Sequence, residues 1–149
     1  MTEPARSSQK RKNDVLHRLE HDKDLWAASA NFEGVPRLVP LSFWWNGEYL
    51  FIATAEKNPT ARNIVETGHV CVALGGTRDV VLIDASARLL DRDEFSIEYG
   101  DAYVAKCGWD PRESKKYRFF RLEPRRVECW REWNEHPDRE VMRGGQWIV

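Results

Sequence analysis

The sequence lacks a long apolar run, a paired set of cysteines and an excess of one charge. Its 149 residues hold 3 cysteines, an odd number at wide spacing (Cys71, Cys107 and Cys129). This excludes a disulfide framework and a CxxC metal knuckle and favours reduced thiols in the cytoplasm. No stretch approaches the roughly 20 apolar residues that a membrane span needs. The net charge of -1 offers no argument for nucleic acid. We therefore expect a cytoplasmic protein that binds neither membranes nor nucleic acid.

Common catalytic signatures are also missing. The chain has no Gly-x-Ser-x-Gly elbow and no GxGxxG fingerprint, which argues against an α/β-hydrolase nucleophile and a Rossmann site. His17 and His21 lie one helical turn apart, but no carboxylate or Cys at matching spacing completes a metal site. We expect no bound metal.

What the chain does contain suits one compact domain. Hydrophobic residues make up 42% and charged residues 32%, which is typical of a globular chain. Residues 1–12 are polar and basic, and we predict that they form a flexible N-terminal arm before a domain over residues 13–149. Tryptophan is abundant: 7 in all, several of them near the C-terminus. Such residues suit a dimer interface or a ring-lined ligand site as well as a core.

Alternating and apolar runs predict mostly strands. Asn46-Gly47 is the strongest hairpin signal and joins Leu41–Trp45 to Tyr49–Thr54 as antiparallel neighbours. A short helix capped by Asn13 or Asp14 and a helix over 93–106 interrupt the strands. The further predicted strands cover 25–30, 35–45, 70–74, 79–90, 117–122 and 126–130. This order, with short links, predicts an antiparallel barrel decorated by helices.

The segment that follows Thr54 carries the clearest functional signal. A strand ends here, and a polar, basic loop (residues 55–63) leads into a short helix pattern that ends at Gly68. Free N–H groups of a first helical turn, the helix dipole and nearby Lys or Arg charges favour a bound anion, such as a phosphate. The alternative is a solvated turn with a helix cap from Asn58 or Thr60.

In order and spacing, several segments resemble one family. They are Gly34-Val35-Pro36, the strand 38–43, Asn46-Gly47, the strand into Thr54, and Thr60-Ala61-Arg62-Asn63. Together they resemble the pyridoxamine 5'-phosphate oxidase-like, FMN-binding split-barrel superfamily, and the runs 125–132 and 139–147 look like a small actinobacterial-type subgroup. The resemblance implies a mainly β fold, a six-stranded antiparallel Greek-key split barrel with peripheral helices. It also implies a homodimer with two flavin or deazaflavin sites between the subunits.

The same resemblance implies the binding residues. Thr54, Lys57, Thr60 and Arg62 match the phosphate-binding segment, and Ser42 lies on the strand beside the isoalloxazine ring. Arg78 is expected to meet a phosphate or the partner, with a surface turn as the alternative. Trp130 and Trp147 are expected to flank the partner's flavin, with core packing as the alternative. Many relatives carry Lys where this chain has Thr60, which leaves weak binding, another cofactor or compensation by Lys57 open.

The expected function is therefore an FMN-dependent oxidoreductase that exchanges hydride between the ring and a small-molecule substrate. Pyridoxamine phosphate oxidase activity itself is not expected, because the chain lacks the Arg-Leu-Ala-Pro-type ending of such members. The alternatives are a deazaflavin-dependent reductase of the same fold and a non-catalytic flavin- or haem-binding dimer. In flavin chemistry the cofactor performs the redox step, so the missing acid–base dyad does not argue against an enzyme.

Overall fold

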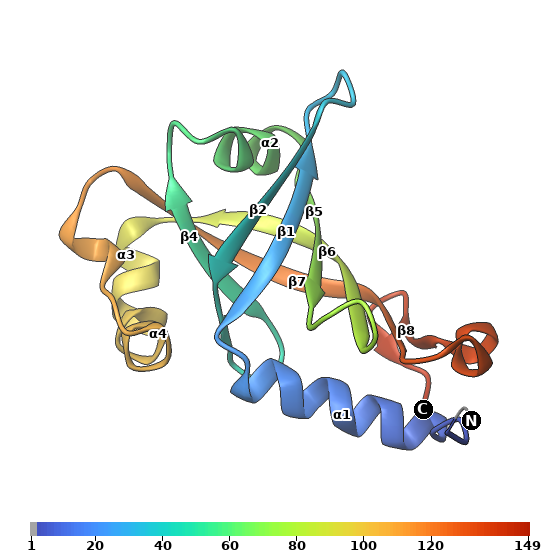
Figure 1. The fold of residues 1–149 in the computed structure, drawn as a ribbon. Coiled ribbons are helices and arrows are strands. Elements are labelled where there is room, and N and C mark those ends of the chain that lie inside the picture. Colours follow the sequence, from blue (N-terminus) through green and yellow to red (C-terminus); the bar gives the residue numbers. More distant parts are fainter. Residues whose placement is uncertain (1–2) are drawn as a thin grey trace.

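A single antiparallel sheet curls into a half barrel in the computed structural model, which describes residues 3–149 (Figure 1). Its main path runs in the order β2-β1-β5-β6-β7-β4-β3, and β8 and β9 extend it from β7. The strands are β1 (Asp24–Ala30), β2 (Pro36–Ser42), β3 (Trp44–Trp45), β4 (Leu50–Ala55), β5 (His69–Leu74), β6 (Val80–Leu90), β7 (Tyr117–Trp130), β8 (Glu140–Arg143) and β9 (Gln146–Trp147).

The mainly β split-barrel prediction is confirmed, with more strands than the six expected. The sheet has nine strands because two-residue strands form at its ends and the C-terminal hairpin β8–β9 adds to β7. The Asn46-Gly47 hairpin is also confirmed: Trp44 pairs with Phe51 and Trp45 with Leu50. Gly47 adopts a φ of 100°, a conformation that favours glycine at this turn.

The two strands predicted over residues 117–122 and 126–130 form a single strand, β7. We expected a break around Pro124, but β7 continues through it and pairs with β6 over nearly the whole length of both. Pro124 lies opposite Ala85, where the register shifts between Asp84 and Ala85. A proline cannot donate to a regular ladder, and the local irregularity removes that demand.

Two helices close the open ends of the half barrel. Helix α1 (Ser8–His21) runs below the sheet in Figure 1, and α2 (Pro59–Thr67) lies at the opposite end. Val15 and Leu19 of α1 and Ala61 and Ile64 of α2 are buried in the main core among strand residues. Among the described residues, no helix is long and apolar enough to cross a membrane.

A helical excursion between β6 and β7 builds a second, smaller core. It consists of α3 (Arg92–Glu94), the π-helical turn η1 (Phe95–Tyr99) and α4 (Gly100–Cys107), followed by the short turn η2 (Pro111–Glu113). The helix predicted over 93–106 is thus present, with one π turn inside it. Phe95 stacks on Phe119 of β7 with ring centroids 4.1 Å apart, and Tyr103 is fully buried beside them.

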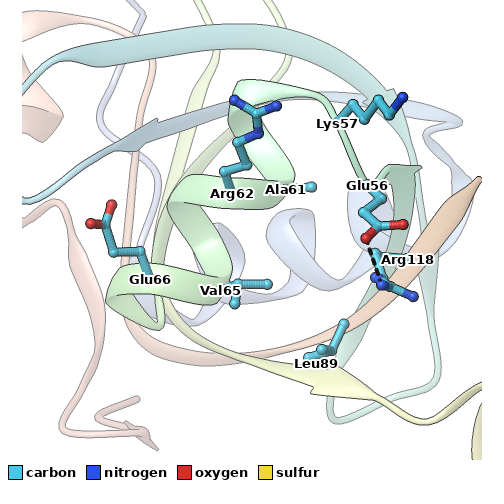
Figure 2. A pocket seen from close by; sticks show the side chains of 8 residues that line it. All are labelled: Glu56, Lys57, Ala61, Arg62, Val65, Glu66, Leu89 and Arg118. Atoms are coloured by element: carbon cyan, nitrogen blue, oxygen red, sulfur yellow. Dashed lines mark ion pairs between the residues drawn. The ribbon is translucent and has the colours of Figure 1, made fainter.

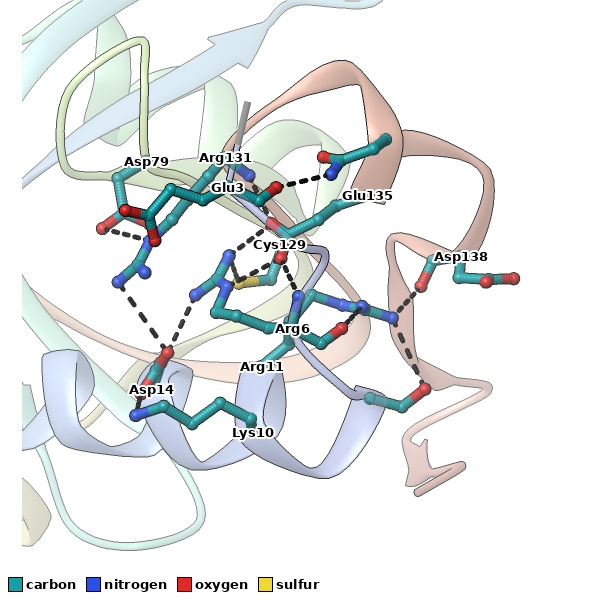
Figure 3. Close-up of polar contacts among 12 residues, drawn as sticks. Glu3, Arg6, Lys10, Arg11, Asp14, Asp79, Cys129, Arg131, Glu135 and Asp138 are labelled. Carbon is teal, nitrogen blue, oxygen red and sulfur yellow. Dashed lines mark hydrogen bonds and ion pairs between the residues drawn. The ribbon is translucent and has the colours of Figure 1, made fainter. Parts of the chain in front are cut away.

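The N-terminal segment is anchored, in contrast to the flexible arm expected over residues 1–12. Residues 8–12 form the start of α1, so the helix begins before the predicted caps Asn13 and Asp14; Ser7 caps it, accepting from the backbone N–H of Lys10. Residues 1 and 2 lie outside the described part. A buried ion pair anchors the segment before α1. The Arg6 guanidinium donates to Glu135 in the C-terminal turn η3 (Trp133–Asp138), with Nη2 2.8 Å from Oε1 (Figure 3).

Both oxygens of the Glu135 carboxylate accept hydrogen bonds. Its Oε2 accepts from the Arg6 backbone N–H and Nε, and Oε1 also accepts from the backbone N–H of Arg131 at 2.7 Å. The hydrogen bonds from Arg6 lower the pKa of Glu135 to about 2, against the penalty of burial. Arg6 also pairs with Asp14 of α1 at 2.9 Å. The network therefore ties the segment before α1 to both α1 and η3.

Replacing Glu135→Gln is expected to lower the free energy of unfolding by about 3 kcal/mol at neutral pH, because Arg6 stays buried without its main counter-charge. Because the folded pKa of Glu135 lies below its ordinary value, its ionic contribution is complete above about pH 5 and is lost as the pH falls toward about 2. The difference between wild type and variant in urea denaturation should therefore stay constant above about pH 5 and shrink as the pH falls toward about 2.

Glu132→Gln provides the matched control. Glu132 is half exposed and makes only a 3.7 Å ion pair with Arg78, so its loss should change stability by less than about 0.5 kcal/mol. Equal losses for the two variants would contradict the anchoring role of Glu135.

Candidate anion-binding groove beside helix α2

Helix α2 forms directly after β4 because its sequence supplies both ends. Pro59 occupies the first turn, where a missing N–H is tolerated, and Gly68 ends the helix in the left-handed conformation with a φ of 68°. Ala61 and Ile64 face the core, so the opposite side of the helix is left to solvent. The predicted strand, loop and short helix ending at Gly68 are present.

The first turn of α2 has no side-chain cap. Asn58 occupies the N-cap position, but its side chain makes no cap hydrogen bond. Its amide Nδ2 instead donates to the hydroxyl of Thr54 at the end of β4, at 3.0 Å. The positive end of the helix is therefore available to a negatively charged group that approaches from solvent.

A groove of about 690 Å³ opens beside this helix and the end of β4. Figure 2 shows Val65 and Ala61 projecting from α2 toward the side on which Leu89 of β6 and Arg118 of β7 lie. Three basic side chains border the groove, Lys57, Arg62 and Arg118. The complete lining is Glu56, Lys57, Ala61, Arg62, Val65, Glu66, Leu89 and Arg118.

The charges of the groove are unequally paired. Arg118 Nη2 lies 2.8 Å from Glu56 Oε1 across the mouth of the groove (Figure 2). Within residues 3–149, Lys57 and Arg62 make no ion pair. A ligand could therefore bind Lys57 and Arg62 without displacing a carboxylate from them. Arg118 becomes available when an anion displaces Glu56. Val65 and Leu89 add an apolar surface, with 57% and 42% of their areas exposed.

The structure places the predicted phosphate residues in two environments. Lys57 and Arg62 line the groove. Thr54 and Thr60 are buried, with 3% and 1% exposed. The Thr54 hydroxyl accepts from Asn58, whereas the Thr60 hydroxyl has no hydrogen-bond partner among residues 3–149. Neither threonine lines the groove, whose charged side chains are Lys57, Arg62 and Arg118 together with Glu56 and Glu66.

The other predicted cofactor residues lie elsewhere in the protomer. Ser42 donates to Asp24 at 3.1 Å, and Arg78 lies 3.7 Å from Glu132. Trp130 meets the His136 ring edge-on, with centroids 5.3 Å apart. Trp147 packs against the main core and has the ammonium of Lys12 5.2 Å from its ring centroid. None of these four side chains lines the groove beside α2.

Arg118 and Leu89 were not predicted as site residues. Each lies on a strand far along the chain from α2, and only strand pairing brings them to it: Arg118 pairs with Thr54 in the β4–β7 ladder. The pattern of residues 117–122 marks a strand but not its neighbour. No local signal could have selected Arg118 among the many arginines of the chain.

A second basic groove adjoins the first. It has a volume of about 400 Å³ and is lined by Ala55, Glu56, Lys57, Lys115 and Lys116. Glu56 and Lys57 border both grooves. A ligand with one anionic group beside α2 could therefore continue toward Lys115 and Lys116 if it carried further negative charge.

The cysteines show no sign of nucleophilic chemistry. Burial, followed by the nearby Asp84, raises the pKa of Cys71 to about 11. Burial also raises the pKa of Cys107 and Cys129. These thiols stay protonated at neutral pH and are poor nucleophiles. Within the described residues, no group of three His, Cys, Asp or Glu side chains is arranged to hold a metal ion.

The two buried threonines should respond oppositely to removal of the hydroxyl. Thr60→Val is expected to raise the free energy of unfolding by about 1 kcal/mol, because a buried hydroxyl without a partner is removed. Thr54→Val is expected to lower it by about 1 kcal/mol, because Asn58 loses its acceptor. Thermal and urea denaturation of the two isosteric variants measure both effects. Destabilisation by Thr60→Val would show that its hydroxyl has a partner in solution.

Comparison with known proteins identifies relatives at the level of the fold. Residues 14–131 match the family model described as pyridoxamine 5'-phosphate oxidase. A search of curated proteins finds no match. Many solved structures are similar, all those described below at less than 25% identity.

Three of these structures illustrate the range of named functions and sequence identities among the similar proteins. The heme storage protein HutZ from Vibrio cholerae is 21% identical, with a TM-score of 0.60 over 76% of this chain and 89% of its own. An F420 reductase is 18% identical, with a TM-score of 0.56 over 74% and 93%. A Clostridium acetobutylicum protein related to general stress protein 26, of the pyridoxinephosphate oxidase family, is 11% identical, with a TM-score of 0.67 over 83% and 90%.

Proposed function

This chain belongs to the pyridoxamine 5'-phosphate oxidase family, and from that premise we propose that it is a homodimeric, FMN-dependent oxidoreductase. The observation that carries the proposal is the groove beside α2. Lys57, Arg62 and Arg118 border this groove, and the helix beside it begins without a side-chain cap among the described residues. This is the arrangement that favours a phosphate dianion.

The residues present fit a flavin phosphate. Lys57 and Arg62, which make no ion pair among the described residues, supply charge. Arg118 presents a planar guanidinium that suits a phosphate once Glu56 is displaced. Val65 and Leu89 offer apolar contact to the rest of the ligand. The buried threonines support the loop from within: Thr54 holds Asn58 away from the helix end.

When bound, a flavin supplies hydride acceptance and donation. In this proposal the chain's own residues bind and orient it: the basic side chains hold the phosphate, and the apolar surface of Val65 and Leu89 excludes water from one side. The substrate is a small molecule that reaches the exposed ring.

Exposed apolar side chains on β1 and β2 support the homodimer. Trp26 and Leu38 project from the outer side of the sheet with 47% and 61% of their areas exposed, and Val35 precedes β2 with 55% exposed. Exposed large apolar side chains on two paired strands are typical of a surface that a partner covers. Ser42, Arg78, Trp130 and Trp147 lie away from the groove, so their predicted contacts with a flavin depend on the second subunit.

A deazaflavin is the second candidate cofactor, and the adjoining groove favours it. Lys115 and Lys116 extend the basic surface beyond Lys57, which suits a ligand whose tail carries additional negative charge. One similar structure is named an F420 reductase. The same Lys57, Arg62 and Arg118 side chains are proposed to hold the phosphate of either cofactor.

Titration of the purified protein with FMN, riboflavin and F420 tests the proposal. FMN is expected to bind at least about tenfold more tightly than riboflavin, because only FMN carries the phosphate. Arg62→Ala and Arg118→Ala should each weaken FMN binding by about tenfold or more, and Lys23→Ala, an exposed change before β1, should leave it unchanged.

The titration has other outcomes, and each leads to a different conclusion. Tighter binding of F420 than of FMN would favour the deazaflavin candidate. Indifference to both cofactors would refute the enzyme proposal. A Soret band on addition of haem to such a protein would then support the non-catalytic binder.

Leu38→Asp should dissociate the dimer. A carboxylate in the middle of a buried apolar contact lacks a partner and must be desolvated. Analytical ultracentrifugation is expected to show a dimer for the wild type and a monomer for the variant. Ile97→Asp, at an 84% exposed position on η1, serves as the control and should remain dimeric. A monomeric wild type would refute the proposed assembly.

A further inference from the structure

Glu56 borders both basic grooves. The groove of about 690 Å³ beside α2 and the smaller one of about 400 Å³ share two lining residues, Glu56 and Lys57. The larger groove has a second carboxylate, Glu66, which does not line the smaller one. Among the described residues that line these grooves, Glu56 is therefore the only carboxylate at their boundary.

The backbone holds Glu56 at this boundary. Its N–H donates to the carbonyl of Lys116 at 2.7 Å, directly beyond the β4–β7 ladder in which Ala55 pairs with Tyr117. The carbonyl of Ala55 in turn accepts from the N–H of Asn58 at 3.0 Å. The side chain of Glu56 can rotate, but these hydrogen bonds keep its backbone between the two grooves.

The carboxylate of Glu56 pairs with Arg118. Its Oε1 lies 2.8 Å from Arg118 Nη2, and Figure 2 shows Glu56 directed toward Arg118 while Lys57 points away from both. The side chains of Glu56 and Arg118 are 55% and 43% exposed, so solvent screens the pair and a ligand can open it at low cost. An anion that binds Arg118 therefore leaves the Glu56 carboxylate close to it, without this partner.

Four further cations are available to a ligand that spans the grooves. Lys57 and Arg62 line the larger groove, and Lys57, Lys115 and Lys116 line the smaller one. None of the four makes an ion pair within residues 3–149. A ligand with two adjacent anionic groups would reach both sets of cations only by lying against Glu56. Coulomb repulsion from one carboxylate grows with the charge of the ligand, so Glu56 disfavours such a ligand more than one with a single phosphate.

We propose that Glu56 is a specificity-determining residue, which shifts the preference of the two grooves from polyanionic ligands toward ligands with a single phosphate. This inference rests on the proposed function only for the position of the phosphate, beside Arg62 and Arg118. It defines the class of cofactor that the site favours. FMN carries one phosphate, whereas the additional negative charge of a deazaflavin tail that extended into the smaller groove would meet Glu56.

Inorganic phosphate and diphosphate are the probes. Their dissociation constants are measured by protein NMR at about pH 8, where phosphate is mostly a dianion, at constant ionic strength and without divalent cations. Glu56→Gln is expected to raise the ratio of diphosphate affinity to phosphate affinity by about threefold or more, because diphosphate carries more charge and lies against the removed carboxylate. Glu56→Asp retains the charge and should keep the ratio within about twofold of the wild type.

Two further changes locate the effect. Glu66→Gln removes the same charge from another exposed position of the larger groove. It should change the ratio by less than about 1.5-fold, since Glu66 does not line the smaller groove. Lys115→Ala together with Lys116→Ala, introduced into the Glu56→Gln protein, should cancel the gain in diphosphate affinity, because the second anionic group loses its cations. Circular dichroism checks that each variant is folded.

Four results would overturn the inference. They are an unchanged ratio in Glu56→Gln, an equal rise of the ratio in Glu66→Gln, a gain that persists without the two lysines, and binding of neither anion by the wild type or by Glu56→Gln. The first three can occur while FMN still binds, which leaves the proposed function intact. Conversely, a protein that binds no flavin but shows the threefold shift in Glu56→Gln refutes the proposed function and supports the selection of anions by Glu56.

Discussion

The pairing of β6 with β7 is the interaction on which the rest of the structure depends. It joins the β2-β1-β5 side of the sheet to the β4-β3 side, and β7 also carries the C-terminal hairpin β8–β9. The register shift near Asp84 and the proline opposite it bend this long ladder. The groove beside α2 takes Leu89 from β6 and Arg118 from β7, so this pair positions two of its side chains.

Strand β4 leads into the charged groove. Basic side chains gather beyond its C-terminal end, around Lys57 and Arg118. The net charge of -1 conceals this local group of cations. Electrostatic recognition depends on local potential, so a nearly neutral chain can still present a candidate anion site.

Local patterns predicted much of the fold and part of the site. The Asn46-Gly47 turn, the strand before Thr54 and the helix that ends at Gly68 follow from turn chemistry and residue periodicity, which act over a few positions. The start of α1 at Ser8 was not predicted, because a basic segment resembles a solvated tail and Glu135, the partner of Arg6, lies more than a hundred residues away. Thr60 looked available for a ligand, but helix packing turns it inward.

The sequence by itself determined the split-barrel family, the hairpin, the strand–loop–helix segment after Thr54, and Lys57 and Arg62 as groove residues. Only the tertiary structure decided that Arg118 and Leu89 join them and that Thr54 restrains Asn58. The reason is physical. Turn and helix signals are short-range, whereas a binding site requires side chains from distant strands, and their proximity depends on the register of the sheet.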